Sequence, residues 1–398
     1  MIEFATNYAE ILTQIENIDP IGYSRSRNFL NGKVTMLSPY LTHGVISLKH
    51  IKESILKKYK YSQVEKLIFE LAWKEYFLRV WENKKDEIWT DLKRPQESQN
   101  NSMSQNIVEA NTGIQAINEQ ITQLYEFGYM HNHARMWTAS LVTNIAKSHW
   151  LSPARWMYYH LLDGDLASNT LSWQWVAGTF SSKKYFANQE NINKYANTRQ
   201  FGTYLDTSYE DFDTIQIPTE LAELQDLDLK TNLAEWVLDS PREGWQTQSE
   251  GVLLAQQNSN FDPKSTTIEN KTSTTKSLIL FHPWMLDPNF GLEISNCEKI
   301  LVLEPSHFNK YPMSRKRIKF ILDLAKNISN LKVFVGEVVE FGLENYDTII
   351  TKKYPAIEHW NNIKNIEIVE PEYMFPTVSG YFGSFMGYWK MCEKAMKQ

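Results

Sequence analysis

The pattern of apolar residues changes across a polar stretch that divides the chain. From Gln256 to Lys276, 13 of 21 residues are Ser, Thr, Asn or Gln, a composition typical of a solvated linker. Before this stretch the apolar residues follow a helical period, whereas after it they form short β-branched runs. We therefore expect a multi-domain fold: a helical domain over 1–200, an acidic irregular segment and polar linker over 201–276, and an α/β domain over 277–398.

The first 200 residues predict helices and no strand of useful length. Apolar side chains share one helical face in two stretches, and Gly128 supplies a left-handed stop after the second. Ser152 and Pro153 supply an N-cap and a first-turn proline for a later helix. Helices are therefore expected over 64–81, 114–125, 131–148 and 152–162.

Short apolar runs after the linker predict strands. The segment 314–328, SRKRIKFILDLAKNI, has a helical pattern and lies between two of them. Alternating strands and helices indicate a small Rossmann-like parallel sheet, but neither GxGxxG nor a P-loop is present to name a ligand. The predicted strands are 277–281, 299–305, 332–336, 347–351 and 366–370.

Charge is distributed unevenly. The net charge of −6 combines 22 Lys and Arg against 19 Asp and Glu over 1–200, 5 against 14 over 201–276, and 14 against 14 beyond. The negative net charge argues against nucleic acid as a partner, although the slightly positive balance of the first 200 residues does not exclude binding of phosphate groups.

Other features exclude whole classes of site. Two cysteines, Cys297 and Cys392, cannot form a disulfide framework, a four-thiolate zinc site or an iron–sulfur cluster, and their scarcity fits a reducing cytoplasm. The acidic opening segment predicts no signal peptide, and no run of eighteen apolar residues predicts a membrane span.

The densest polar cluster is HLLDGDLASNTLSWQWVAG, residues 160–178, in which Asp163 and Asp165 flank a glycine. The sharp turn that glycine permits lets both carboxylates face one site. Upstream, Asn132 and Arg135 share one face of a predicted helix, and Arg135 would keep Asp163 ionised. The alternative is an ordinary ion pair with no further role.

Two more clusters have both a functional and an ordinary interpretation. In FELAWKEYF, residues 69–77, Glu70, Trp73 and Lys74 share a helical face on which a planar ring could stack and hydrogen-bond; the alternative is a core Trp with solvated charges. In 22–44 a hydroxyl-rich loop enters a helix near Ser38, which suits phosphate oxygens or is a plain N-cap.

Together, in this order, the four clusters resemble the photolyase/cryptochrome family over residues 22–186. The resemblance implies an all-α domain that binds FAD in a U-shaped conformation. It also implies a role in binding FAD for Tyr23, Thr35, Leu37, Ser38, Glu70, Lys74, Asn132, Arg135, Asp163, Asp165, Ser168 and Asn169.

The chain also departs from the family pattern. The loop Val34-Thr35-Met36-Leu37-Ser38 lacks the usual arginine, and Leu67 stands where a Trp is common. The α/β domain, which resembles the family's antenna domain in form, comes last instead of first. We therefore leave a second, antenna chromophore unknown.

The resemblance also assigns roles in light-driven chemistry. Trp73 and Trp175 match the walls that stack a flipped pyrimidine dimer, while Glu70 and Asn132 would hydrogen-bond it. Asn132 together with Met136 favours the cyclobutane lesion over the (6-4) lesion. Trp173 and Trp150 match the inner and middle members of the electron-transfer chain. The outer member, due near Pro95, is missing; its candidate replacements are Trp89, Trp156, Tyr158 and Tyr159.

The resulting expectation is a deoxyribodipyrimidine photo-lyase-like enzyme. It would use FAD and blue or near-UV light to split cyclobutane pyrimidine dimers in damaged DNA, as a cytoplasmic monomer without a metal or a membrane partner. One alternative is a cryptochrome-like blue-light photoreceptor without repair activity. Another is a FAD-binding protein without photochemistry.

Overall fold

Helices fill the first part of the chain, as the apolar period predicts. The computed structural model describes residues 2–239, 245–249, 252–255 and 276–396. Two short strands, β1 (Met103–Ser104) and β2 (Leu224–Gln225), pair antiparallel beside these helices. The helices are α1 (Tyr8–Glu16), α2 (Pro20–Ser26), α3 (Ser38–Thr42), α4 (Leu48–Lys58), α5 (Tyr61–Lys84), α6 (Gln105–Val108), α7 (Gln115–Phe127), α8 (Asn132–Ser140), α9 (Leu151–His160), α10 (Leu166–Ala177) and α11 (Gln189–Ala196).

The four predicted helices are confirmed, with shifted ends. α5 contains all of 64–81, and α7 ends at Gly128, whose φ of 68° is the predicted left-handed stop. The stretch 131–148 is shorter as an α-helix than expected, because α8 gives way to a π-helical turn at Leu141–Ile145.

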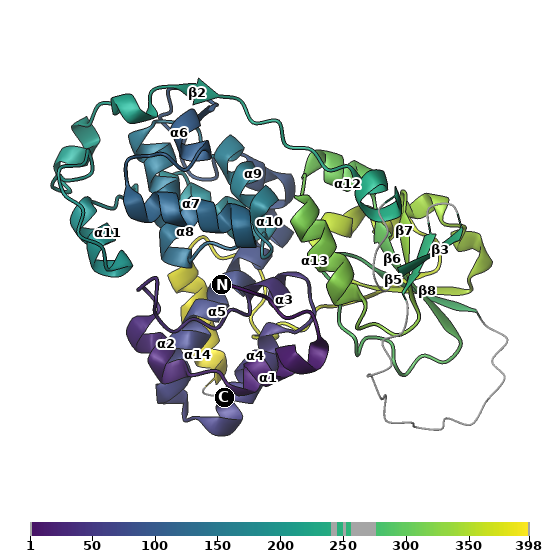
Figure 1. Cartoon of the computed structure of the whole chain (residues 1–398). Coiled ribbons are helices and arrows are strands. Elements are labelled where there is room, and N and C mark those ends of the chain that lie inside the picture. Colours follow the sequence, from purple (N-terminus) through teal and green to yellow (C-terminus); the bar gives the residue numbers. More distant parts are fainter. Residues whose placement is uncertain (1, 240–244, 250–251, 256–275, 397–398) are drawn as a thin grey trace.

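A mixed sheet forms the second part of the structure, beside the helices in Figure 1. Its described strands lie in the order β3-β4-β7-β6-β5-β8-β9, and β5 to β9 run parallel. The order of the parallel strands confirms a Rossmann-like arrangement with β5 in the middle. These elements are β5 (Ser277–Phe281), β6 (Cys297–Leu303), α12 (Pro305–Lys310), α13 (Arg315–Ala325), β7 (Leu331–Val335), β8 (Thr348–Lys352) and β9 (Ile366–Val369).

A hairpin extends this sheet from a segment that we expected to be irregular. β3 (Trp245–Ser249) and β4 (Val252–Ala255) pair antiparallel, and β4 pairs antiparallel with β7. The expectation for 201–276 is therefore wrong at these residues. The open edge of β7 supplies the hydrogen-bonding partner, which a local pattern does not reveal. Residues 256–275 of the predicted linker lie outside the described residues.

The end of the chain returns to the helices. α14 (Phe385–Met396), yellow in Figure 1, packs against α5. One apolar core also crosses between the two parts, since it contains Tyr40 and Trp81 as well as Phe281 and Leu301. The domain limits stay a prediction, but the helical and α/β parts share buried surface.

Candidate flavin site

The turn between α9 and α10 carries the two predicted aspartates. α9 ends at His160 and α10 begins at Leu166. Asp165 is the N-cap of α10, and its Oδ1 accepts a hydrogen bond of 2.7 Å from the Ser168 amide. Capping therefore fixes this carboxylate at the start of a helix, where the helix dipole favours negative charge.

Arg135 contacts both carboxylate oxygens of the first aspartate through one nitrogen. Its Nη2 lies 2.9 Å from both Oδ1 and Oδ2 of Asp163, while its Nε donates to the Met130 carbonyl at 2.8 Å. Burial alone would raise the pKa of Asp163, but the Arg135 charge and the Ser38 hydroxyl outweigh it, so the pKa lies below the ordinary value. The structure thus brings together Arg135, Asp163 and Ser38; the sequence suggested only the pairing of Arg135 with Asp163.

Lys74 holds the second aspartate from α5. Its Nζ lies 3.3 Å from Oδ2 of Asp165 and donates to the Thr42 hydroxyl at 3.0 Å. The Thr42 hydroxyl in turn donates to the Asp163 carbonyl at 3.1 Å. Burial opposes ionisation of Asp165, yet Lys74 and the Ser168 amide lower its pKa. Two ionised, nearly buried carboxylates therefore lie within one connected network.

Glu70, one turn before Lys74 on α5, has its own cationic partners. Its Oε1 is 2.7 Å from Lys66 Nζ and 3.3 Å from Arg27 Nε, and its side chain is 29 % exposed. Burial and then the Glu70 carboxylate raise the pKa of the nearby Tyr23, whose hydroxyl stays protonated. Glu70 therefore lies among two cationic side chains and one neutral hydroxyl group.

The remaining predicted cofactor residues lie on the same elements. Asn132 is exposed at the start of α8, with Met136 half-buried one turn later. Asn169 donates to the Ala154 carbonyl at 2.8 Å, which fixes its amide on α10. Leu37 is the N-cap residue of α3 and has no side-chain capping bond, while Thr35 and Ser38 are half-buried beside it.

The two predicted stacking walls each have a protein partner. The Trp73 ring stacks on Phe385 of α14, with centroids 3.7 Å apart and planes 11° apart. The Trp175 ring lies 5.9 Å from Tyr185 at 38°. One face of Trp73 is thus covered by the C-terminal helix, and the stacking roles stay a prediction.

Trp150 has a polar partner where the outer electron-transfer residue was expected. Its indole Nε1 donates to Oδ1 of Asp91 at 2.6 Å, and its neighbouring ring is His149, at 5.5 Å. Within the described part of the chain, ring contacts join the proposed replacements to other residues: Trp89 to Tyr311, and Trp156 to Tyr125. No contact therefore supports these two as the next member after Trp150.

Several partners of the predicted site residues were not predicted from the sequence. Arg27 and Thr42 lie in the loop region that was singled out, but no pattern marked them as partners of Glu70 and Lys74. Tyr354 comes from the α/β part, and its hydroxyl donates to Asp165 Oδ2 at 3.1 Å. Nothing local in the sequence indicates this contact.

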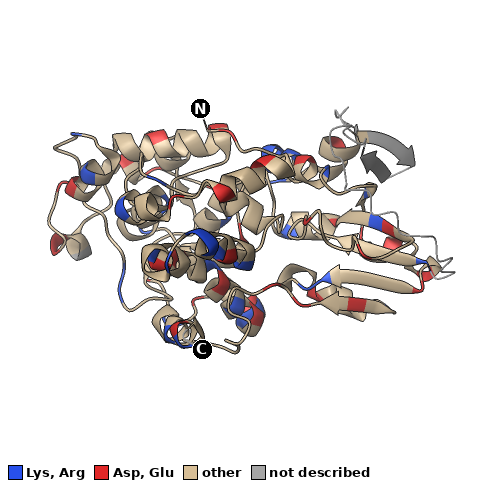
Figure 2. Cartoon of the chain, turned by 90° about the horizontal axis from the view of Figure 1, so that it is seen from below, with Lys and Arg blue, Asp and Glu red and all other residues tan. Residues whose placement is uncertain are grey.

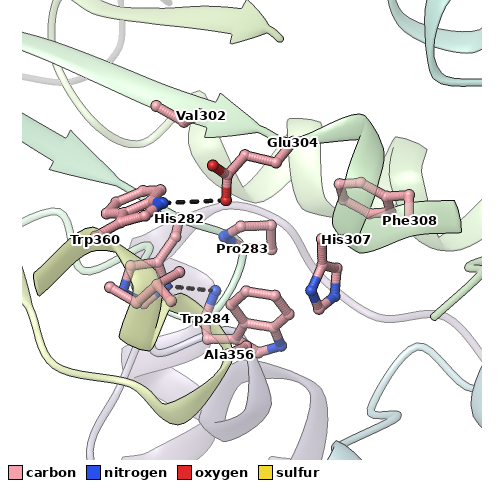
Figure 3. Close-up of a pocket in the computed structure, with 10 residues that line it drawn as sticks. His282, Pro283, Trp284, Val302, Glu304, His307, Phe308, Ala356 and Trp360 are labelled. Atoms are coloured by element: carbon pink, nitrogen blue, oxygen red, sulfur yellow. Dashed lines mark hydrogen bonds between the residues drawn. The ribbon is translucent and has the colours of Figure 1, made fainter. Parts of the chain in front are cut away.

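Two cavities lie elsewhere. One, of about 330 Å³, lies between α9 and the α/β part and is lined by His149, Arg155 and Lys310 among others. The other, of about 10 Å³, has room for about one water at the carboxyl ends of β5 and β6 (Figure 3). In Figure 3 the Glu304 carboxylate accepts a hydrogen bond from the Trp360 indole, at 3.1 Å. The described residues contain no group of three or more His, Cys, Asp or Glu that could hold a metal ion.

His282, in the smaller cavity, makes the protein sensitive to acid. Its Nε2 donates to the Lys352 carbonyl at 2.9 Å and its Nδ1 accepts from the Trp284 amide, a pattern that only a neutral ring satisfies. Burial lowers the pKa of His282 to about 4. Between pH 6.5 and 4 the unfolded chain therefore binds a proton that the folded chain does not. We expect the free energy of unfolding to fall by about 1.4 kcal/mol per pH unit in this window because of this residue.

Urea unfolding of His282→Gln between pH 7 and 4 measures this contribution. The variant should show a shallower pH slope than the wild type. An unchanged slope in His282→Gln would show that His282 does not titrate in this way.

Comparisons with known proteins agree with the motifs. Residues 67–249 match the family described as the FAD binding domain of DNA photolyase. The resemblance to the photolyase/cryptochrome family is therefore confirmed over residues 67–249, which match this FAD-binding domain. Within the described part of the chain, no helix has the length and apolar character needed to cross a membrane.

The individual relatives are similar over a limited region. A deoxyribodipyrimidine photo-lyase from Streptomyces griseus is 33 % identical over 161 residues, which are 39 % of this chain and 35 % of that protein. A cryptochrome DASH from Gloeobacter violaceus is 26 % identical over 177 residues, 41 % of this chain and 35 % of the relative. A cryptochrome structure from Synechocystis shares 22 % identity over 49 % of this chain and 44 % of its own, with a TM-score of 0.44. The chain thus spans about a third of the length of these curated relatives.

The donor set fits FAD. A diphosphate needs cations and hydroxyls, which Arg27, Lys74 and Ser38 supply, and an isoalloxazine edge needs amide and carboxylate partners. The amide partner is Asn169 of α10, and the carboxylate partners are the ionised Asp163 and Asp165 in the turn before that helix.

Proposed function

We propose that the chain is a FAD-dependent, light-driven enzyme that splits cyclobutane pyrimidine dimers in DNA. When bound, reduced FAD would supply an electron to the dimer under blue or near-UV light and take it back after ring splitting, without net oxidation. The observation that carries the proposal is the connected network of Arg135, Asp163, Lys74 and Asp165, inside the region that matches a photolyase FAD-binding domain.

The protein's own residues would bind and orient both partners. Arg135 and Lys74 keep the two aspartates ionised, so these present fixed acceptors to the cofactor. Glu70 and Asn132 would hydrogen-bond the dimer, and Trp73 and Trp175 would stack against it. The half-exposed Glu70 carboxylate and the exposed Asn132 amide can reach a ligand that arrives from solvent.

DNA would be held by local cations and not by the net charge of the protein. Figure 2 shows basic and acidic positions interspersed along the helices, in line with the near balance over residues 1–200. Affinity for DNA should therefore fall with added salt, and an intact duplex should be bound weakly.

A repair assay tests the proposal. Chemically reduced holoprotein should convert a dimer-containing oligonucleotide to monomers under near-UV light, and not in the dark. Glu70→Gln should slow this conversion about tenfold, because the hydrogen bond to the dimer loses its charged acceptor. Glu53→Gln, at an exposed position of α4, should have no effect. Absence of any light-dependent monomer formation by FAD-loaded wild type would reject repair.

One observation favours a second candidate, a blue-light photoreceptor without repair activity. Phe385 covers a face of Trp73, one of the rings that a repair enzyme would offer to the lesion. A photoreceptor should bind dimer-containing and intact oligonucleotides equally, whereas a repair enzyme should prefer the dimer. Competition between the two oligonucleotides, measured by fluorescence anisotropy, therefore separates the two functions.

A further inference from the structure

The α/β part contacts the aspartate turn through a buried arginine. Arg317 of α13 is fully buried; its Nη1 donates to the Tyr158 carbonyl at 3.0 Å and its Nη2 to the Gly164 carbonyl. Its guanidinium also lies over the Tyr158 ring, 4.4 Å from the centroid. A Cβ on Gly164 would lie 2.5 Å from Arg317 Nη1, so glycine at this position makes room for the guanidinium. Arg317 therefore fixes the backbone between the two aspartates.

A tyrosine from the same part contacts the second aspartate directly. Tyr354 follows β8, and its hydroxyl donates to the Asp165 oxygen that also faces Lys74. Burial and the Asp165 charge keep its pKa well above the ordinary value, so the hydroxyl remains a donor. Asp165 thus has a cationic and a neutral partner on one oxygen.

The ring of Tyr354 is held in place from two sides. It stacks on Trp284, with centroids 5.0 Å apart and planes 10° apart, and it meets the edge of Trp81 at 5.6 Å. Trp284 also lines the small cavity in Figure 3, at the carboxyl ends of the parallel strands. The sheet therefore positions the hydroxyl through packed rings, and the contact does not depend on a free side chain.

We propose that Tyr354 is a positioning residue of the flavin site: through Asp165 it sets the negative charge beside the flavin, while Arg317 fixes the turn. This inference rests on the proposed function. It makes the α/β part a component of the cofactor site, in addition to any antenna role. Without the Tyr354 hydroxyl, Asp165 presents a less compensated negative charge, which opposes addition of an electron to the flavin.

The test compares Tyr354→Phe with Tyr346→Phe. The control removes an equivalent hydrogen bond in the same part of the protein, from the Tyr346 hydroxyl to Glu298 Oε2 at 2.6 Å. The readouts are the midpoint potential of the bound flavin and its dissociation constant. Tyr354→Phe should lower the potential and weaken FAD binding about tenfold, whereas Tyr346→Phe should leave both at wild-type values.

The outcomes separate the inference from the proposed function. If the wild type takes up no FAD, the proposed function fails and the inference fails with it. If the wild type binds FAD and Tyr354→Phe matches Tyr346→Phe in both readouts, the inference alone is overturned. Should Tyr354→Phe not fold, Arg317→Lys, which keeps the charge but loses the fork, must show the same two changes; wild-type values in that variant would equally overturn it.

Discussion

Replacing Arg135 with Met is expected to lower the free energy of unfolding by about 3–5 kcal/mol and to abolish retention of FAD. The Asp163 side chain is only 3 % exposed, and Arg135 Nη2 lies within hydrogen-bond distance of both its carboxylate oxygens. Without Arg135 the chain must bury an unpaired charge or protonate it, and either change removes the fixed acceptor from the site. Urea unfolding and the flavin content of the purified protein measure the two effects.

Two further variants make this result specific. Arg155→Met removes an exposed arginine from the neighbouring helix α9 and should change neither stability nor flavin content. Arg135→Lys should have a stability and a flavin content between those of the wild type and Arg135→Met, because lysine keeps the charge but loses the hydrogen bond from Nε to the Met130 carbonyl. If Arg135→Met kept wild-type stability and a full complement of flavin, the pair would be an ordinary ion pair with no role in the site.

Replacing Glu75 with Ala should release the C-terminal helix from α5 and cost about 3–5 kcal/mol. The Glu75 side chain is 1 % exposed and faces four donors. Its carboxylate accepts from the Tyr388 hydroxyl at 2.8 Å, from the Phe375 amide at 3.2 Å, from Arg79 at 3.3 Å and from the Met374 amide. Truncation leaves these buried donors without their acceptor and removes the hydrogen bond that joins Tyr388 of α14 to α5.

Hydrogen exchange and limited proteolysis measure the release of α14 from α5. Amides within Phe385–Met396 should lose protection in Glu75→Ala, and Trp73 should become accessible to a fluorescence quencher, because Phe385 no longer covers its ring. Glu65→Ala, at an exposed position of the same helix, should leave both readings unchanged. Unchanged protection of α14 in Glu75→Ala would show that apolar packing alone holds the helix.

The sequence allowed local elements and locally built parts of the site to be predicted. Helices such as α5 follow from the spacing of their apolar residues, and Gly128 ends α7 in the left-handed conformation expected of it. The Arg135–Asp163 pair was also foreseen, because each residue lies in a motif with a recognisable neighbourhood.

What could not be predicted depends on contacts between distant segments. Tyr354 reaches Asp165 across 189 residues, and Arg317 reaches Gly164 across 153. Apolar periodicity, helix caps and local motifs do not predict such contacts, because these depend on how the α/β part packs on the helices. The same reason explains the hairpin β3–β4, whose partner is the edge of β7, and the stacking of Phe385 on Trp73.

The central claim is that the helices around Arg135, Asp163 and Asp165 form a binding site for FAD. Titration of the flavin-free protein with FAD, followed by quenching of flavin fluorescence, tests it most directly. We predict saturation at one FAD per chain in the wild type and no saturable quenching in Arg135→Met. A wild-type protein that stays colourless and leaves flavin fluorescence unchanged would contradict the account.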